Sequence, residues 1–269
     1  MKKLIAMLLA VTMVLALAAC AKTEAPVTTA APETTEAATE ATTEAPTEAE
    51  TTAPAEENTV MTYEEYMAAE VDSKVTVETY VQAHQSWWED KITVYAQSPE
   101  GAMFLYELAC SEEDAAKMVP GTKIRVTGDK AEWNGEVEIM NGTFEFVEGD
   151  SFVAEAADLT ALLGTDDLAA HQNEFVTLKG LTVEAANDEG AAYLYKWDGS
   201  GEEGDDLYFN VSLDGKTYSF TVESYLCDKD SDVYKAVKEL KVGDVVDLEG
   251  YLYWYNDAQL HTTSVAAAQ

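Results

Sequence analysis

Residues that could perform catalysis are scarce in this chain. Its histidines are His84, His171 and His261; none has a spacing typical of a zinc site, and no nucleophile motif surrounds a serine. Carboxylates are plentiful, but with 51 of them in 269 residues any spacing arises by chance. Paired carboxylates therefore indicate solvated surface charge. We expect a protein that is not an enzyme and has no cofactor, and we keep an enzyme of unrecognised type as an alternative.

Two acidic runs could bind a hard cation, the first at 198–206 and the second at 228–232. Calcium is bound by about six to eight oxygen ligands, many of them carboxylates. Neither run has the internal Gly and distal Glu of an EF-hand, and carboxylates in the second run also suit the first turn of a helix. A calcium site is therefore a secondary hypothesis, with these candidate ligands: Asp198, Ser200, Glu202, Asp205 and Asp206.

Aromatic residues form two rows with the spacing of a strand. Alternate residues of a strand share a face, so Tyr251, Tyr253 and Tyr255 lie on one side. Residues 193–197 carry a second row. Such rows either pack between domains or form a flat platform for sugars or cationic peptides. The candidate ligand-binding residues are Tyr193, Tyr195, Trp197, Tyr251, Tyr253, Tyr255 and Asn256.

The chain is strongly acidic. It has 16 basic residues against 51 acidic ones, a formal net charge of −35, and Arg125 is its only arginine. The acidity is not confined to a tail, because residues 58–269 alone hold 42 acidic and 13 basic residues. Nucleic-acid binding normally draws its affinity from Lys and Arg side chains that neutralise phosphates. The charge therefore predicts that nucleic acid is not a partner.

One glycine-bounded pattern occurs twice, at Gly121–Gly128 and Gly243–Gly250. Each copy has two aliphatic residues separated by one position, as in a half-buried strand. A Trp and an Asn-containing turn follow each copy, at 133–135 and 254–257. We interpret the folded part as two tandem copies of one structural unit.

In the first unit the sequence predicts a helix from Thr62 to about Glu70, three strands, a short helix and two more strands. The strands are expected near 75–81, 91–97, 102–108, 121–128 and 136–139, and the short helix at 111–119. This order resembles the OB-fold, a five-stranded Greek-key barrel whose ligands lie over strands two and three and between the first and fourth connecting loops. The expected class is mainly β with short helices (α+β), with two tandem OB-like barrels, each preceded by a helix.

The second unit is expected to repeat this order. It begins with a mainly helical stretch at 154–171, broken at Gly164. An insertion at 185–206 follows the first strand and carries Trp197. Cys110 and Cys227 occupy matching places in the two units, either as a disulfide or as free thiols. The remaining elements are a strand from 175, a hairpin at 207–213 and 216–223, a helix at 228–240, and strands at 243–250 and 257–265.

The N-terminus has the order of an export signal. Lys2 and Lys3 precede an apolar run, Leu4–Ala19, which is short for a membrane span. The run ends Leu17-Ala18-Ala19-Cys20, which resembles the lipobox of bacterial lipoproteins; the resemblance implies lipidation of Cys20. Residues 21–57 are almost entirely Ala, Thr, Glu and Pro, a composition that predicts disorder. The expected divisions are a signal peptide at 1–19, a tether at 20–58, and barrels within 59–150 and 151–269.

Together these features resemble bacterial lipoproteins with tandem OB-fold-like domains, which implies a fold and a location but no substrate. The expected protein is anchored outside the cytoplasm to the cell membrane by its N-terminal lipid. Its expected role is a non-catalytic binding or adaptor module for carbohydrate, peptide or an envelope protein. A nucleic-acid-binding OB protein is the alternative that the charge disfavours.

Overall fold

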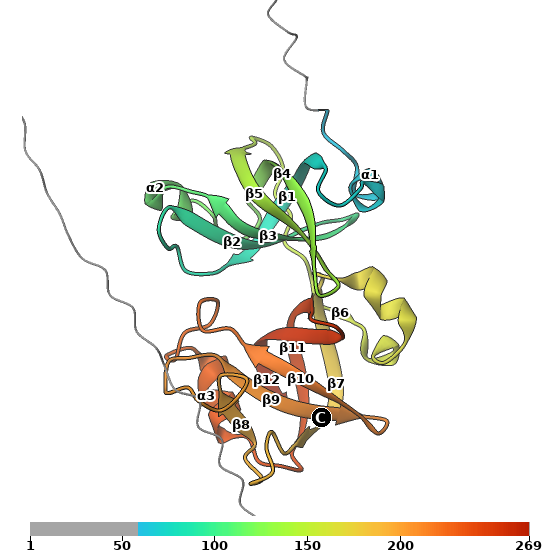
Figure 1. The fold of residues 1–269 in the computed structure, drawn as a ribbon, viewed down its shortest axis with the longest axis vertical. Coiled ribbons are helices and arrows are strands. Elements are labelled where there is room, and N and C mark those ends of the chain that lie inside the picture. The colour runs from blue at the N-terminus through green and yellow to red at the C-terminus, as the bar shows by residue number, and fades with distance from the viewer. Residues whose placement is uncertain (1–58, 269) are drawn as a thin grey trace, which may run out of the picture. The chain divides into compact units, whose positions relative to one another are not determined.

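The computed structural model describes residues 59–268 and contains two closed five-stranded barrels, coloured blue to green and yellow to red in Figure 1. This confirms the predicted class, mainly β with short helices and tandem OB-like barrels. The predicted signal peptide, Cys20 and the whole of the predicted tether lie outside the described residues. No helix within 59–268 is long and apolar enough to cross a membrane.

The first barrel has the strand order β1-β2-β3-β5-β4, closed by pairing of β4 with β1. Strands β3 and β5 are parallel, and the other neighbours are antiparallel. Alternation builds the core: Ile124 and Val126 point inward from β4 while the residues between them stay partly exposed. The strands are β1 (Lys74–His84), β2 (Lys91–Ser98), β3 (Gly101–Ala109), β4 (Lys123–Trp133) and β5 (Glu136–Phe146).

Helix α1 (Tyr63–Ala68) begins where the sequence predicts, with a complete capping box between Thr62 and Glu65. It ends two residues early. Lys130 reaches the C-terminal end of α1, and its Nζ donates to three backbone carbonyl oxygens there at 2.7–3.0 Å. Helix α2 (Glu112–Ala115), capped by Ser111, is shorter than predicted.

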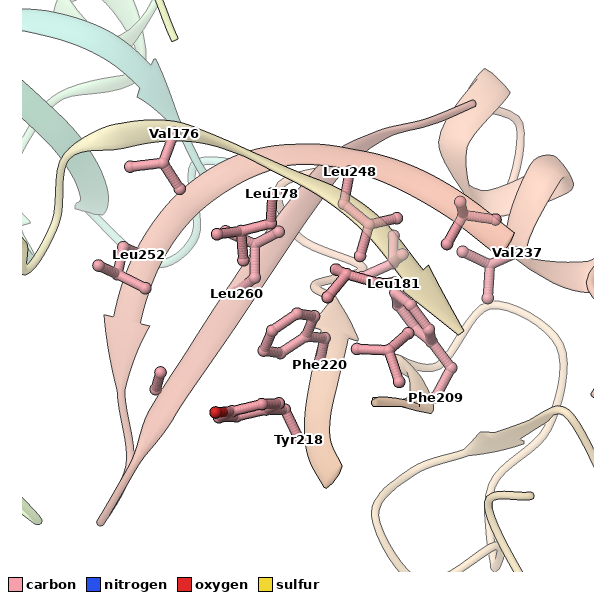
Figure 2. Close-up of a cluster of buried hydrophobic side chains, with 14 of the residues drawn as sticks. Val176, Leu178, Leu181, Phe209, Tyr218, Phe220, Val237, Leu248, Leu252 and Leu260 are labelled. Carbon is pink, nitrogen blue, oxygen red and sulfur yellow. The ribbon is translucent and has the colours of Figure 1, made fainter. Parts of the chain in front are cut away.

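The second barrel is wound in the same way. Strand β7 pairs with β11 on one side and with β9 on the other, and β10 and β12 are parallel. Figure 2 shows aliphatic and aromatic side chains from all five strands packed inside it. Its strands are β7 (Phe175–Glu184), β9 (Leu207–Leu213), β10 (Lys216–Val222), β11 (Val245–Trp254) and β12 (Ala258–Ala267); short strands β6 (Ala157–Asp158) and β8 (Tyr193–Tyr195) lie at the sheet's ends.

The helical expectation for 154–171 is wrong. The stretch forms strand β6 and two 3₁₀ turns, η1 (Thr160–Leu162) and η2 (Asp166–His171). The Asp158 carboxylate accepts from the backbone N–H of Thr160, which gives the chain a turn in place of a helical bond. Gly164, with φ +88°, then separates the two turns.

Helix α3 (Asp232–Glu239) begins four residues later than predicted, because Ser231 is its N-cap. The Asp228 carboxylate accepts from the backbone N–H of Asp230, which makes a turn before the helix.

The two barrels pack along a seam that we define by Tyr95, Phe104, Tyr251 and His261. The Tyr95 and Tyr251 rings stack with centroids 4.5 Å apart, and Tyr95 Oη lies 2.7 Å from His261 Nδ1. A second contact joins the two β-turns after β4 and β11, where the backbone N–H of Asn256 donates to the carbonyl oxygen of Asn134 at 2.7 Å. The barrels are thus connected at both a ring stack and a turn.

The repeated second glycine has a steric reason. Gly128 and Gly250 lie at register shifts in the β4–β5 and β11–β12 pairs. A Cβ at Gly250 would lie 2.3 Å from the carbonyl oxygen of His261, and one at Gly128 would lie 2.8 Å from that of Met140. The strands approach too closely there for any side chain.

We therefore predict that Gly250→Ala lowers the free energy of unfolding by about 3 kcal/mol, because backbone must move to accept the methyl group. Gly243→Ala is the matched control: its Cβ meets nothing within 4 Å, and only its φ of +93° opposes Ala. The control should lose about 1 kcal/mol. Urea unfolding measures both, and equal losses would contradict the steric explanation.

Candidate ligand-binding groove

Two cavities open side by side on the strands of the barrels. One, of about 540 Å³, is lined by both barrels, and the other, of about 740 Å³, lies on the second barrel. They share Tyr208, Tyr255 and Gln259 and therefore adjoin one another. We call the two together the aromatic groove, after the exposed rings that line it: Trp88, Trp133, Trp197, Tyr225 and Tyr255.

Equivalent elements of the two barrels supply these rings. In the first barrel, Trp88 lies in the β1–β2 loop and Trp133 at the β4–β5 turn, beside residues of β2 and β3. In the second, Trp197 lies in the β7–β9 connection and Tyr255 at the β11–β12 turn, beside β9 and β10. These are the strands two and three and the loops one and four that bind ligands in OB-folds.

Each of these four rings adjoins a residue in the left-handed region of backbone conformation. The neighbours are Glu89 (φ +46°), Asn134 (+50°), Lys196 (+58°) and Asn256 (+61°). Asn adopts this conformation readily, but Glu and Lys do so at a cost of about 1–2 kcal/mol. Such residues cluster at functional sites because the surrounding structure holds them there. The turns thus fix where the rings point.

The groove is acidic. The one lysine that lines the cavity between the barrels, Lys91, is paired with Glu107 at 2.5 Å. At the other end Asp257 pairs with Lys216 at 2.6 Å. Glu89 and Glu223 add two further carboxyl groups to the lining. The surface therefore repels phosphate groups and favours neutral or cationic ligand atoms.

A hydrogen-bonded chain links the seam to the cavity floor. The Gln85 amide nitrogen donates to Tyr95 Oη at 3.4 Å, so the Tyr95 hydroxyl proton is directed to His261 Nδ1. Burial lowers the pKa of His261 to about 3, so its ring is neutral and carries its proton on Nε2. That atom lies 3.9 Å from Glu223 Oε1. Burial, with a smaller contribution from Asp206, raises the pKa of Glu223 to about 8.

The Tyr251 row is divided between seam and groove. Tyr251 is 6% exposed and sealed against Tyr95. Tyr253 is half-buried, stacks on His261 with centroids 4.3 Å apart and lines the cavity between the barrels. Tyr255 is 50% exposed and lines both cavities. The backbone N–H of Asn256 donates the hydrogen bond to Asn134 that joins the turns of the two barrels.

The Tyr193 row is divided in the same way. Tyr193 and Tyr195 are half-buried, meet edge to face at 5.6 Å and pack against the core of the second barrel. Trp197 is 75% exposed and lines the cavity with Tyr255. The structure thus brings Trp197 and Tyr255, the exposed ends of the two rows, to the same cavity. The other tyrosines of the rows are buried or half-buried and pack against neighbouring side chains.

The carboxylates of the first acidic run have protein partners. Asp198 accepts from the backbone N–H of Ser200, Asp205 from that of Glu202, and Asp206 from the hydroxyl and backbone N–H of Ser224. Within residues 59–268 no group of three or more His, Cys, Asp or Glu side chains is placed to hold a metal ion. Calcium binding by Asp198, Ser200, Glu202, Asp205 and Asp206 stays a prediction.

Several groove residues were not predicted. Trp87 packs on the first core and Trp88 is exposed, and no sequence pattern indicated that Trp88 would lie on the same groove as Trp197. Tyr208, Glu223 and Tyr225 come from strands and loops with no local motif. The repeat itself was the usable signal, because Trp133 follows the first glycine-bounded strand as Trp254 follows the second. Cys110 and Cys227 are free thiols.

In the comparison with known proteins, no family model and no curated protein matches the chain. Solved structures match at low identity. A murine DNA-binding protein bound with double-stranded DNA is 11% identical, with a TM-score of 0.33, over 72% of this chain and 96% of that one. The Ifi202 HINa domain in complex with dsDNA is 10% identical, with a TM-score of 0.33, over 73% and 100%. A replication protein A heterotrimer bound to ssDNA is 8% identical, with a TM-score of 0.30, over 73% and 49%.

These findings correct two expectations drawn from the sequence. The first was an adaptor for carbohydrate, peptide or an envelope protein, and the second was the exclusion of nucleic acid. Three of the solved structures that resemble this chain are DNA complexes, which agrees with the alternative that the charge disfavoured. Neither expectation is retained. The likeness itself concerns the fold alone.

A second buried carboxyl group sits where the turns of the two barrels meet. Glu136 is fully buried, and its Oε2 accepts from the backbone N–H of Trp254 at 2.9 Å. Burial raises the pKa of Glu136 to about 8 and that of nearby Glu138 to about 7. The pKa of Glu136 is near 4.5 in the unfolded chain and about 8 in the folded one, so between these pH values the folded chain binds more protons. The free energy of unfolding therefore falls as the pH rises from about 4.5 to about 8.

We predict that the free energy of unfolding falls between pH 6.5 and 8.5, a range above the unfolded pKa of His261. In Glu136→Gln the fall should be smaller by about 2 kcal/mol, because one ionisation is removed. Urea unfolding at the two pH values measures this. Glu132→Gln, an exposed carboxylate on β4, is the control and should follow the wild-type slope. A Glu136→Gln slope equal to wild type would contradict the assignment.

Proposed function

We propose that the two barrels bind single-stranded nucleic acid along the aromatic groove, with bases stacked on the exposed rings and without catalysis. The observation that carries this proposal is the placement of Trp88 and Trp133 on one barrel and Trp197 and Tyr255 on the other, at equivalent loops beside strands two and three. Exposed rings at these positions are the stacking platforms of OB-folds, and stacking tolerates any base sequence.

The adjacency of the two cavities supports an extended ligand. Both cavities share Tyr208, Tyr255 and Gln259, so an extended ligand in one cavity would reach the edge of the other. Flat rings at both ends suit a ligand whose successive groups are themselves planar. Base stacking contributes about 1–3 kcal/mol per base.

The charge of the chain determines how such a ligand binds. With 42 acidic and 13 basic residues in 58–269, phosphate contacts cannot supply the affinity. The bases must supply it, against repulsion between the groove and the backbone. Salt screens this repulsion. Affinity for a natural strand should therefore rise with salt, opposite to the usual dependence.

The test is fluorescence anisotropy with two labelled strands of about eight nucleotides, a length that OB-folds occupy. One strand is natural and the other has an uncharged methylphosphonate backbone. We expect the uncharged strand to bind more tightly, and binding of the natural strand to strengthen as salt is raised. Trp88→Ala and Trp197→Ala should each weaken binding by about 1–3 kcal/mol.

Phe146→Ala is the matched control, since Phe146 is an exposed ring outside the groove. It should bind as wild type does. The proposal is overturned if neither strand binds, or if the tryptophan variants bind as tightly as the control. Affinity for the natural strand that falls with salt would overturn the base-led mode of binding.

We further propose that the chain is exported and anchored to the outer face of the membrane by lipid on Cys20. The proposal rests on the apolar run Leu4–Ala19 and on Leu17-Ala18-Ala19-Cys20. A single acyl chain holds a protein only marginally, whereas two chains anchor it stably. The Ala, Thr, Glu and Pro residues of 21–57 would then set the barrels away from the membrane.

Expression of the full chain in a bacterial host tests this. Wild type should incorporate radiolabelled palmitate and partition into the detergent phase of a Triton X-114 extract. Cys20→Ala should incorporate no label and stay in the aqueous phase, whereas Cys110→Ala should behave as wild type. A mature wild-type N-terminus at any residue other than Cys20 would contradict the proposal.

A further inference from the structure

Glu223 lies at the floor of the cavity between the barrels, and its carboxyl group accepts no hydrogen bond from the described residues. Its side chain is 19% exposed, and its Oε1 lies 3.9 Å from His261 Nε2, which is beyond hydrogen-bond distance. Buried carboxylates normally accept several hydrogen bonds. A carboxylate that faces a cavity with its acceptors unused is arranged for a ligand.

Eight of the eighteen residues that line the cavity around Glu223 are Trp, Tyr or Phe. Tyr208 and Tyr253 flank it from the second barrel, and Tyr225, Trp88 and Trp133 line the opening. Ring faces attract cations at distances within about 6 Å of the centroid. The one lysine in the lining, Lys91, is held by Glu107 at 2.5 Å and is not available to Glu223. The cavity thus has a counter-ion and rings but no cation of its own.

We propose that this cavity binds the ammonium group of a small primary amine, with Glu223 as its counter-ion and the surrounding rings as its walls. This goes beyond nucleic-acid binding and does not rest on it. A primary ammonium carries three N–H donors, which match the unused carboxylate oxygens. A quaternary ammonium carries none and would use only the ring faces. Gln85 and Gln259 also line the cavity and offer amide oxygens as further acceptors.

Binding should be coupled to proton release. Burial raises the pKa of Glu223 to about 8, so at neutral pH the carboxyl is largely protonated in the empty cavity. An ammonium ion favours the ionised form, so the proton leaves when the ligand binds. The titratable and charged groups that face Glu223 are Tyr95 on β2, Tyr208 on β9, Tyr253 on β11, His261 on β12, and Asp206 before β9.

The experiment is isothermal titration calorimetry of the full chain with n-butylammonium and with butyltrimethylammonium. We expect n-butylammonium to bind at least tenfold more tightly than the quaternary ion. Below the pKa of Glu223, its affinity should rise about tenfold for each unit by which the pH is raised, because less work is then needed to remove the proton. Titrations in buffers with different ionisation enthalpies should show that a proton is released.

Glu223→Gln keeps the shape of the side chain and should weaken n-butylammonium binding by at least tenfold. Glu239→Gln, an exposed carboxylate on α3 that does not line the cavity, is the control and should bind as wild type does. The proposal is overturned if n-butylammonium does not bind at millimolar concentration, if both ions bind equally, or if the two variants lose affinity equally. If Glu223→Gln does not fold, the proton release measured with the wild-type protein becomes the test. A wild-type titration that shows no proton release overturns the proposal.

Discussion

The contact on which the rest of the structure depends is the one between Tyr95 and the second barrel. Ring stacking against Tyr251 supplies buried area, but stacked rings can slide over one another. The hydrogen bond from Tyr95 to His261 is directional and removes that freedom. Because His261 also lines the cavity, the interaction that holds the barrels together also sets the floor of the groove. The ligand faces of the two barrels become one surface only in this arrangement.

The groove combines two properties that rarely serve the same ligand: large exposed rings and a surplus of carboxyl groups. Rings favour planar or cationic groups, whereas carboxylates oppose phosphates. Burial reduces this conflict, because the raised pKa of Glu223 and Glu136 lets both stay neutral near pH 7. The negative field in the groove therefore comes mainly from exposed carboxylates at the rim, which salt screens. Ligands that reach the floor meet a protonated acid, which can donate as well as accept a hydrogen bond.

Much of the fold could be predicted from local patterns, and the groove could not. Thr62 and Glu65 are three residues apart, so their capping box is visible in the sequence. Gly128 and Gly250 repeat because two strands meet without room for a side chain, and that constraint also leaves a sequence signal. Glu223 leaves none, since its burial depends on His261 and on a barrel more than a hundred residues earlier. The stretch at 154–171 misled because Asp158 and Gly164 form turns that override its helical composition.

The alternation of the Tyr251 row identified a shared face but not what covers it. Strand β11 runs out of the seam into the groove, so Tyr251 is covered by Tyr95 while Tyr255 is exposed. One rigid strand thus carries both a packing residue and a groove residue. Beyond Tyr255 the backbone N–H of Asn256 is held by Asn134 of the first barrel. The ring is therefore fixed from both sides before any ligand arrives, which lowers the ordering cost of binding. The contacts that pack the barrels together are therefore also the contacts that pre-organise the groove.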